Sequence, residues 1–195
     1  MKFRALFAIG LLVLCTTAIA DEPQKKQPPA DDPMMKAAMP GDAHKLLDGM
    51  VGTWDAKVSM WMDPSQPPMV SSGTSENSWV LGNRAVMQKF NSTLMGQPFS
   101  GLGFTGYDNM KKQYWGTWMD TMSTAVMPST GNTPDNGKTW KFTVSMPDPA
   151  SGKDVPVEER VTVTDKDHHT MEMWMAGPDG KQFKMMEIQY TRKKS

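Results

Sequence analysis

From Thr53 onward the chain alternates between apolar and polar residues with a period of two. The alternation is clearest in residues 54–62, 140–146 and 155–164. A period of two places apolar side chains on one face of a strand and polar ones on the other, so these segments predict half-buried strands. Sequences rich in Pro, Gly, Asn and Asp separate the apolar runs at hairpin spacing. The pattern as a whole predicts about nine or ten antiparallel strands.

The predicted strands are joined by local hairpins, and each has one apolar face. A sheet with this many strands usually curls or closes, so we expect an all-β fold, an antiparallel up-and-down β-barrel with a filled or ligand-holding interior. A two-sheet β-sandwich is the alternative. Residues 42–51 carry apolar positions at helical spacing before Gly52. They predict a short N-terminal helix that plugs one end of the barrel.

Residues 101–124 predict one β-hairpin with its turn at 108–111. The second strand carries Tyr114, Trp115 and Trp118, which are too many large aromatics for one face, so both faces need to be covered. Residues 101–106 also match G-x-G-x-x-G, a sequence that opens a helix in dinucleotide-binding folds. Here the glycines lie in an extended run. We therefore interpret them as places where the strand bends or where a bulky neighbour needs room.

The first 20 residues have the form of a secretory signal peptide, with a basic start, an apolar run and an A-x-A sequence ending at Ala20. A lipoprotein is the competing interpretation because of Cys15, but the preceding Leu14 is larger than the small residue of a lipobox. We expect a periplasmic or secreted protein. Residues 21–39 mix prolines with charges of both signs and predict a flexible tether. The rest of the chain is predicted to form a single domain at 40–192 and a basic tail at 193–195.

Charge and cysteine content exclude several classes of function. Removing residues 1–20 leaves two fewer basic than acidic side chains, so no strong positive field is available for nucleic acid or an anionic membrane. It also removes the single cysteine, which excludes a disulfide framework and a thiolate nucleophile. The apolar run near the start is too short for a transmembrane segment. Oligomeric state is not predicted by these features.

Methionine is unusually abundant, at 20 of 195 residues. Met171, Met173 and Met175 alternate along one predicted strand, on the same face as His169. Thioethers beside an imidazole are suitable ligands for Cu(I). We expect no cofactor, and copper is the alternative. We favour the interpretation that methionine fills an irregular barrel interior, because its unbranched chain adapts to gaps. The histidines lack the spacing of a zinc site.

Three carboxylates interrupt the apolar alternation: Asp120, Glu159 and Glu187. If these faces line the barrel, the carboxylates need partners, and a structural ion pair is the favoured interpretation. The alternative is a lumen in which a few polar groups orient a bound molecule. No nucleophile elbow or triad accompanies the carboxylates, so no catalytic residue is predicted. The candidate partners are Arg84, Arg160 and Arg192.

Several short motifs together resemble the DUF1579 family of uncharacterised proteins. They are H-K-L-L at 44–47 with V-G-T-W at 51–54, G-F-T-G-Y-D at 103–108, W-M-D-T-M-S-T at 118–124 and Y-T-R at 190–192. The resemblance covers about residues 39–192. It implies a lipocalin-like or calycin-type barrel with a central cavity, and it brings no established ligand, reaction or catalytic residue.

The leading hypothesis is an exported protein that binds a small apolar molecule. The sequence does not decide whether it is an enzyme, and a protein without enzymatic activity is the favoured interpretation. Periplasmic Cu(I) handling by His169 and the methionine row is the second hypothesis. A carboxylate-dependent enzyme that uses Asp120 with Glu159 or Glu187 is the third. The expected ligand-binding residues are Trp54, Met60, Trp115, Asp120, Trp140, Phe142, Met171, Met173, Met175 and Glu187.

Overall fold

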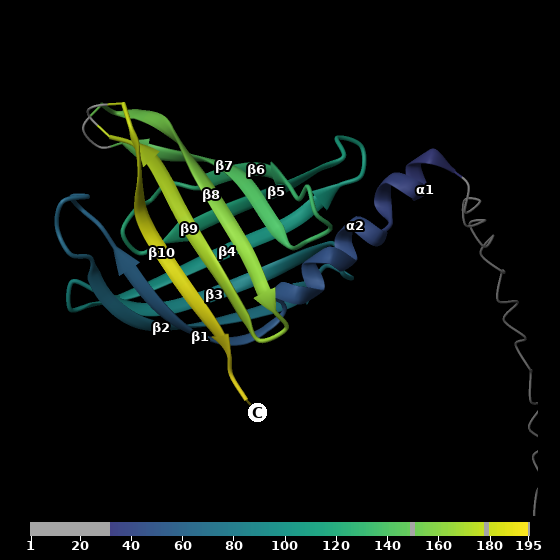
Figure 1. Cartoon of the computed structure of the whole chain (residues 1–195). Coiled ribbons are helices and arrows are strands. Elements are labelled where there is room, and N and C mark those ends of the chain that lie inside the picture. Colours follow the sequence, from purple (N-terminus) through teal and green to yellow (C-terminus); the bar gives the residue numbers. More distant parts are fainter. Residues whose placement is uncertain (1–31, 149–150, 178–179, 195) are drawn as a thin grey trace, which may run out of the picture.

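A computed structural model describes residues 32–148, 151–177 and 180–194. These residues form one closed antiparallel barrel of ten strands (Figure 1). The strands are β1 (Gly52–Met60), β2 (Met69–Val80), β3 (Ala85–Leu94), β4 (Gln97–Asp108), β5 (Gln113–Asp120), β6 (Met127–Asn132), β7 (Thr139–Asp148), β8 (Lys153–Asp165), β9 (His168–Ala176) and β10 (Gln182–Arg192). The expected signal peptide, and the part of the expected tether before Asp32, lie outside the described residues.

The order of the strands around the barrel follows the sequence. Each strand pairs with the next one along the chain, and β1 pairs with β10 to close the sheet. Trp54 on β1, for example, lies opposite Arg192 on β10 and Ser75 on β2. The structure thus confirms the up-and-down barrel and excludes the sandwich. Inward-facing side chains alternate with outward-facing ones along each strand, as the period of two requires.

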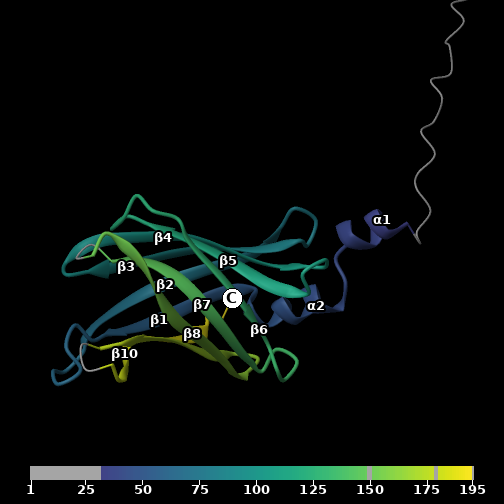
Figure 2. The ribbon, with the colours of Figure 1, turned by 90° about the horizontal axis from the view of Figure 1, so that it is seen from above.

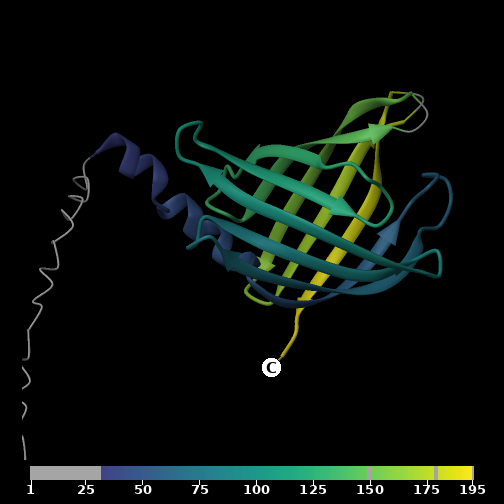
Figure 3. The ribbon, with the colours of Figure 1, turned by 180° about the vertical axis from the view of Figure 1, so that it is seen from behind.

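One end of the barrel is closed by the segment before β1, as expected. Helix α2 (Asp42–Lys45) continues into the 3-10 helix η1 (Leu46–Met50). Leu47 is fully buried against a cluster that includes Tyr114 and Trp140. The Tyr114 hydroxyl also donates a hydrogen bond to the Ala43 carbonyl at 2.7 Å. We call residues 42–50, which include α2, the plug, and Figure 3 shows this blue segment at one end of the barrel.

Part of the expected tether forms a further helix, α1 (Pro33–Ala38), which projects away from the plug end (Figure 2). Asp32 caps it by accepting a hydrogen bond from the Met34 amide at 2.7 Å. The Asn109 side chain in the β4–β5 turn donates to the Met39 carbonyl at 2.8 Å, which connects the segment after α1 to the barrel. Among the described residues, no helix is long and apolar enough to cross a membrane.

The expected hairpin is formed by β4 and β5, with residues 109–112 in the turn. Trp118 points into the barrel and Trp115 points out of it, as the alternation along β5 dictates. A Cβ atom at Gly101 would overlap the Trp118 indole, and one at Gly106 would overlap the Trp115 indole. These glycines therefore make room for the tryptophans of the neighbouring strand.

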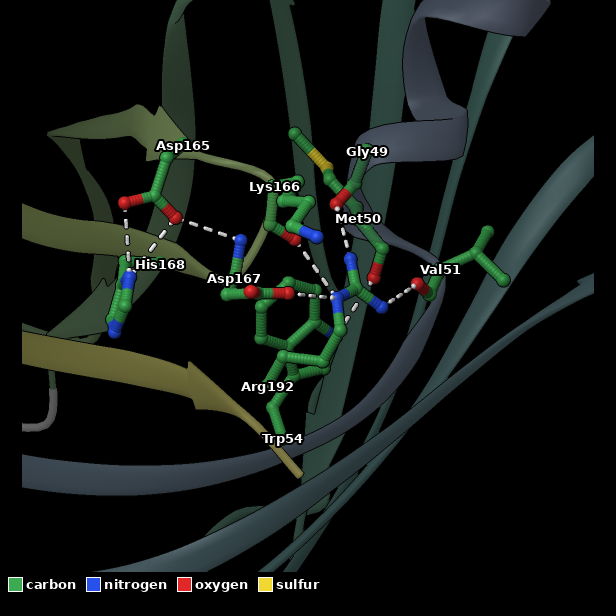
Figure 4. A network of polar contacts seen from close by, with 9 residues as sticks. All are labelled: Gly49, Met50, Val51, Trp54, Asp165, Lys166, Asp167, His168 and Arg192. Carbon is green, nitrogen blue, oxygen red and sulfur yellow. Dashed lines mark hydrogen bonds and ion pairs between the residues drawn. The ribbon is translucent and has the colours of Figure 1, made fainter. Parts of the chain in front are cut away.

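The seam between β1 and β10 is held at the plug end by Arg192 (Figure 4). Its guanidinium lies 4.0 Å from the centre of the Trp54 ring, a cation–π distance. It also donates hydrogen bonds to the Val51 and Lys166 carbonyls, each at 2.8 Å. The Trp54 indole in turn donates to the Met50 carbonyl at 3.0 Å. Motifs from the two ends of the domain, residues 51–54 and 190–192, are thus joined in one contact network.

Candidate ligand-binding site

The barrel contains a cavity of about 360 Å³. It extends from Met50, the last residue of the plug, to Leu94 and Met122 at the opposite end, which we call the mouth. Aromatic side chains from several strands contribute to the wall, among them Phe90 and Trp118. The largest group of lining residues is the methionines: Met50, Met60, Met122, Met127, Met146, Met171, Met173, Met185 and Met186.

Five of the residues expected to bind a ligand line this cavity: Met60, Asp120, Phe142, Met171 and Met173. The strand alternation places all of them on the inner face. The structure therefore brings together side chains from β1, β5, β7 and β9 around one space.

Three further expected residues point inward but lie beyond the cavity wall. Trp54 is buried under Arg192, and Trp140 packs against Leu47 of the plug. Met175 packs into an apolar cluster with Met146 and other methionines. These side chains form the packed core at the two ends of the lumen, and they support the cavity without lining it.

Trp115 and Glu187 lie on the outer surface, in contrast to the expectation. Tyr114 and Trp118 point inward, so Trp115 on the same strand points outward. A β-bulge between Lys184 and Met186 shifts the alternation in β10, and this places Glu187 outside the barrel. There Glu187 pairs with Lys184, whose ammonium group also lies 3.0 Å from the Glu172 carboxylate. Its hydrogen bond with Lys184 lowers the pKa of Glu187.

The arginines expected to neutralise the three carboxylates bind elsewhere. Arg84 donates to the Ala38 carbonyl at 3.0 Å, and Arg160 pairs with Glu158 on the outer face at 2.6 Å. Arg192 is occupied in the network around Trp54. The interpretation of Asp120 and Glu159 as members of structural ion pairs with these arginines was therefore wrong.

Asp120 stands near the mouth with both carboxylate oxygens engaged. One oxygen accepts a hydrogen bond from the Trp118 indole at 2.8 Å, and the other accepts one from the Met122 amide at 2.8 Å. Because the acceptor is charged, these bonds are stronger than neutral ones. They hold Trp118 in one orientation across the inner face, which positions part of the cavity wall.

Glu159 lies at the middle of β8 and faces the cavity. Phe142 is its partner in register on β7, and Met173 is its partner on β9. Within the described residues it makes no hydrogen bond or ion pair, and burial raises the pKa of its carboxyl to about 7. Asp120 and Glu159 thus share a cavity, whereas Glu187 is separated from both by the barrel wall.

A chain of polar side chains lies in the lumen near the plug, and the sequence reasoning did not identify it. The Gln88 amide donates to the Ser75 hydroxyl at 2.9 Å and lies 3.5 Å from the Tyr190 hydroxyl. Ser75 donates to the Asn77 side chain at 2.7 Å. One signal was available: Gln88 is the polar residue between Val86 and Phe90 in a period of two.

His169 completes the polar end of the cavity. Its ring stacks on Tyr190 at 4.4 Å between centroids and meets the edge of Trp54 at 4.3 Å. Burial, assisted by the nearby charge of Arg192, lowers the pKa of His169 to about 4. Burial also raises the pKa of Tyr190 above its usual value. Both side chains are therefore uncharged at neutral pH.

The residues of the hypothetical copper site are divided between two environments. His169, Met171 and Met173 line the cavity, whereas Met175 lies in the apolar cluster beyond it. In the part of the chain that the structure describes, no group of three or more His, Cys, Asp or Glu side chains could hold a metal ion. Thioether ligands are not among these four residue types, so copper binding stays a prediction.

Comparisons with known proteins agree with this architecture. The family described as "Protein of unknown function (DUF1579)" matches residues 39–192. The crystal structure of Rv2717c from M. tuberculosis is similar at a TM-score of 0.57 and 13% identity, over 79% of this chain and 99% of that chain. A redesigned β-barrel covers 78% of this chain and 96% of its own at 16% identity, with a TM-score of 0.41. No curated protein matches the sequence. At these identities the likeness to Rv2717c shows the fold alone.

Proposed function

The chain belongs to DUF1579, a family of proteins of unknown function, and we propose that it binds a small, largely apolar molecule inside its barrel. The observation that carries the proposal is the cavity of about 360 Å³ enclosed by the ten strands. Ligand pockets are typically about 300–1,000 Å³, so this one suits a small ligand. Methionines are the largest group in its wall, beside aromatic side chains and a set of polar groups that would fix orientation.

The methionine lining supports binding over simple filling of the lumen. Nine methionines line the cavity, yet they leave space between them. Methionine has three rotatable bonds and a polarisable sulfur, so a wall of methionines adjusts to an occupant at little cost. An unoccupied apolar cavity is also unfavourable, because its lining atoms lose dispersion contacts. A molecule that entered would restore those contacts.

Export is a second part of the proposal. The basic start, apolar run and A-x-A sequence of residues 1–20 support it. The mature protein would then begin at Asp21 and meet its ligand outside the cytoplasm. Measuring the intact mass of the purified protein checks this. A mass that corresponds to a chain with residues 1–20 still present would contradict the proposal of export.

Filling the cavity tests the binding proposal. Thr105 lines the cavity, whereas Thr143 is exposed on the outer face of β7. Thr105→Phe places a ring in the lumen and Thr143→Phe places the same ring in solvent. Titration with the neutral fluorescent probe N-phenyl-1-naphthylamine is expected to show binding to the wild type and to Thr143→Phe. Affinity for Thr105→Phe should be lower by about tenfold or more, since overpacking a site costs about 1–3 kcal/mol. Equal affinity in all three proteins would place the probe outside the barrel and contradict the proposal.

A further inference from the structure

The carboxyl group of Glu159 is the feature of the cavity that an apolar ligand leaves unexplained. It projects from the middle of β8 between Phe142 and Met173, neither of which can donate a conventional hydrogen bond. Among the described residues it has no hydrogen-bond or ion-pair partner. An ionised carboxylate in such surroundings is costly unless something pairs with it. The fold would avoid this cost with an apolar residue at the same position.

The rest of the lining, as far as the structure describes the chain, supplies no positive charge. Neither lysine nor arginine is among these described lining residues. The other titratable groups that face the lumen are Asp120, His169 and Tyr190. His169 and Tyr190 are uncharged at neutral pH, because burial lowers the pKa of the first and raises that of the second. Every charge that the lining itself can carry at neutral pH is therefore negative.

The two carboxylates differ in what they offer to a ligand. Asp120 already accepts hydrogen bonds from the Trp118 indole and the Met122 amide, near the mouth. Glu159 has its full acceptor capacity free and is placed deeper, midway between the mouth and the plug. A ligand that entered through the mouth would pass Asp120 and reach Glu159 with its leading end.

We propose, on the basis of the ligand-binding function above, that the ligand is a lipophilic amine whose protonated nitrogen pairs with the Glu159 carboxylate. An ammonium group supplies the donors and the charge that Glu159 lacks. The surrounding aromatic faces, including Phe142 and Tyr190, attract cations, and methionine sulfur is polarisable enough to pack beside them. A fatty acid would meet two negative groups and no cation. A neutral ligand would leave the half-buried carboxylate uncompensated.

The raised pKa of Glu159, about 7, adds a pH dependence to this pairing. At pH 5.5 the empty site is mainly protonated and neutral, and an amine must displace that proton to form the pair. At pH 8 the carboxylate is ionised, while an alkylamine stays protonated because its pKa resembles that of lysine, about 10.4. Binding of an amine is therefore expected to strengthen from pH 5.5 to pH 8, whereas binding of an alcohol of equal length should not strengthen.

The test is a competition experiment with octylamine, octanol and octanoate, each displacing N-phenyl-1-naphthylamine from the full mature chain. At pH 8 octylamine should displace the probe from the wild type at a concentration lower than that of octanol by about tenfold or more, as expected for a hydrogen bond to a charged group. Glu159→Gln should remove this preference, so that octylamine no longer displaces the probe at a lower concentration than octanol does. Glu158→Gln, on the outer face, should retain the preference.

The outcomes separate this inference from the proposed function. Equal displacement by octylamine and octanol in the wild type overturns the amine inference and leaves a cavity that binds apolar molecules. Stronger displacement by octanoate also overturns it, and indicates a protonated Glu159 that donates to an acid. If neither the probe nor any competitor binds the wild type, the proposed function fails as well. Urea unfolding of Glu159→Gln establishes that the variant is folded, so that a lost preference reports on the site.

Discussion

At the scale of residues, burial in the barrel shifts the pKa values of Glu159 and His169 in the directions that favour their uncharged forms. The pKa of Glu159 is raised to about 7, and the pKa of His169 is lowered to about 4. Their contributions to stability therefore run in opposite directions with pH. The Glu159 contribution is present below its ordinary pKa of 4.5 and is lost as pH rises through 7. The His169 contribution is present above 6.5 and is lost as pH falls through 4.

Glu159→Gln separates the two effects, because the difference from the wild type cancels the shared His169 term. Glutamine is neutral at every pH, so the free energy of unfolding of the variant minus that of the wild type should rise between pH 4.5 and 7. Above pH 7 it should level off. The rise should approach about 3 kcal/mol, since one pKa unit corresponds to about 1.4 kcal/mol. Urea unfolding at intervals from pH 4.5 to 8.5 measures it.

Glu158→Gln is the matched control for this series. Glu158 is exposed and pairs with Arg160 on the outer face. The free energy of unfolding of Glu158→Gln should differ little from that of the wild type. The difference should also stay nearly constant over the same pH range, because most surface ion pairs contribute little. A flat curve for Glu159→Gln as well would mean that the Glu159 carboxyl is hydrated in the lumen, contrary to the burial described here.

At the scale of elements, the barrel closes where β1 and β10 meet, and Arg192 links that seam to the plug. Its guanidinium contacts the Trp54 ring and two backbone carbonyls. Lysine keeps the charge but lacks the planar fork that reaches several acceptors. We expect Arg192→Lys to lower the free energy of unfolding by about 2–3 kcal/mol, comparable with losing hydrogen bonds to a charged group. Urea unfolding at pH 8 gives the value.

Arg160→Lys is the matched control, because Arg160 pairs on the outer face with the partly exposed Glu158. Its expected cost is below about 1 kcal/mol. If Arg192→Lys lowers the free energy of unfolding by no more than Arg160→Lys does, the network in Figure 4 does not hold the seam. Closure of the barrel then depends on the strand pairing alone.

The same elements show how far the sequence predicts the fold and the site. Alternation in residues 54–62 and 140–146 identified strands and their inner faces, because one face is apolar and the other polar. It failed for Glu187, since the bulge at Lys184–Met186 shifts the alternation without any mark in the sequence. It also gave no warning of the polar inner face of β2, where Ser75 and Asn77 alternate with residues that are equally polar.

At the scale of the whole molecule, closure is what creates the cavity, and closure depends on contacts between residues far apart in the sequence. The period of two identified the inward methionines, but it could not show whether they fill the lumen or line a space. That outcome depends on how ten strands curve around each other and on the volumes of side chains from all of them. The structure resolves the question as a cavity of about 360 Å³ beside Glu159, which has no partner among the described residues.

The proposed function requires that a small molecule occupies that cavity, and the most direct measurement is to recover the molecule. Wild type and Thr105→Phe should be purified in parallel from the native source, extracted with organic solvent and compared by mass spectrometry. We expect one compound to recur in the wild-type extract near equimolar amounts and to be reduced or absent in the Thr105→Phe extract. Equal extracts from the two proteins, or repeated recovery of nothing from the wild type, would contradict the account.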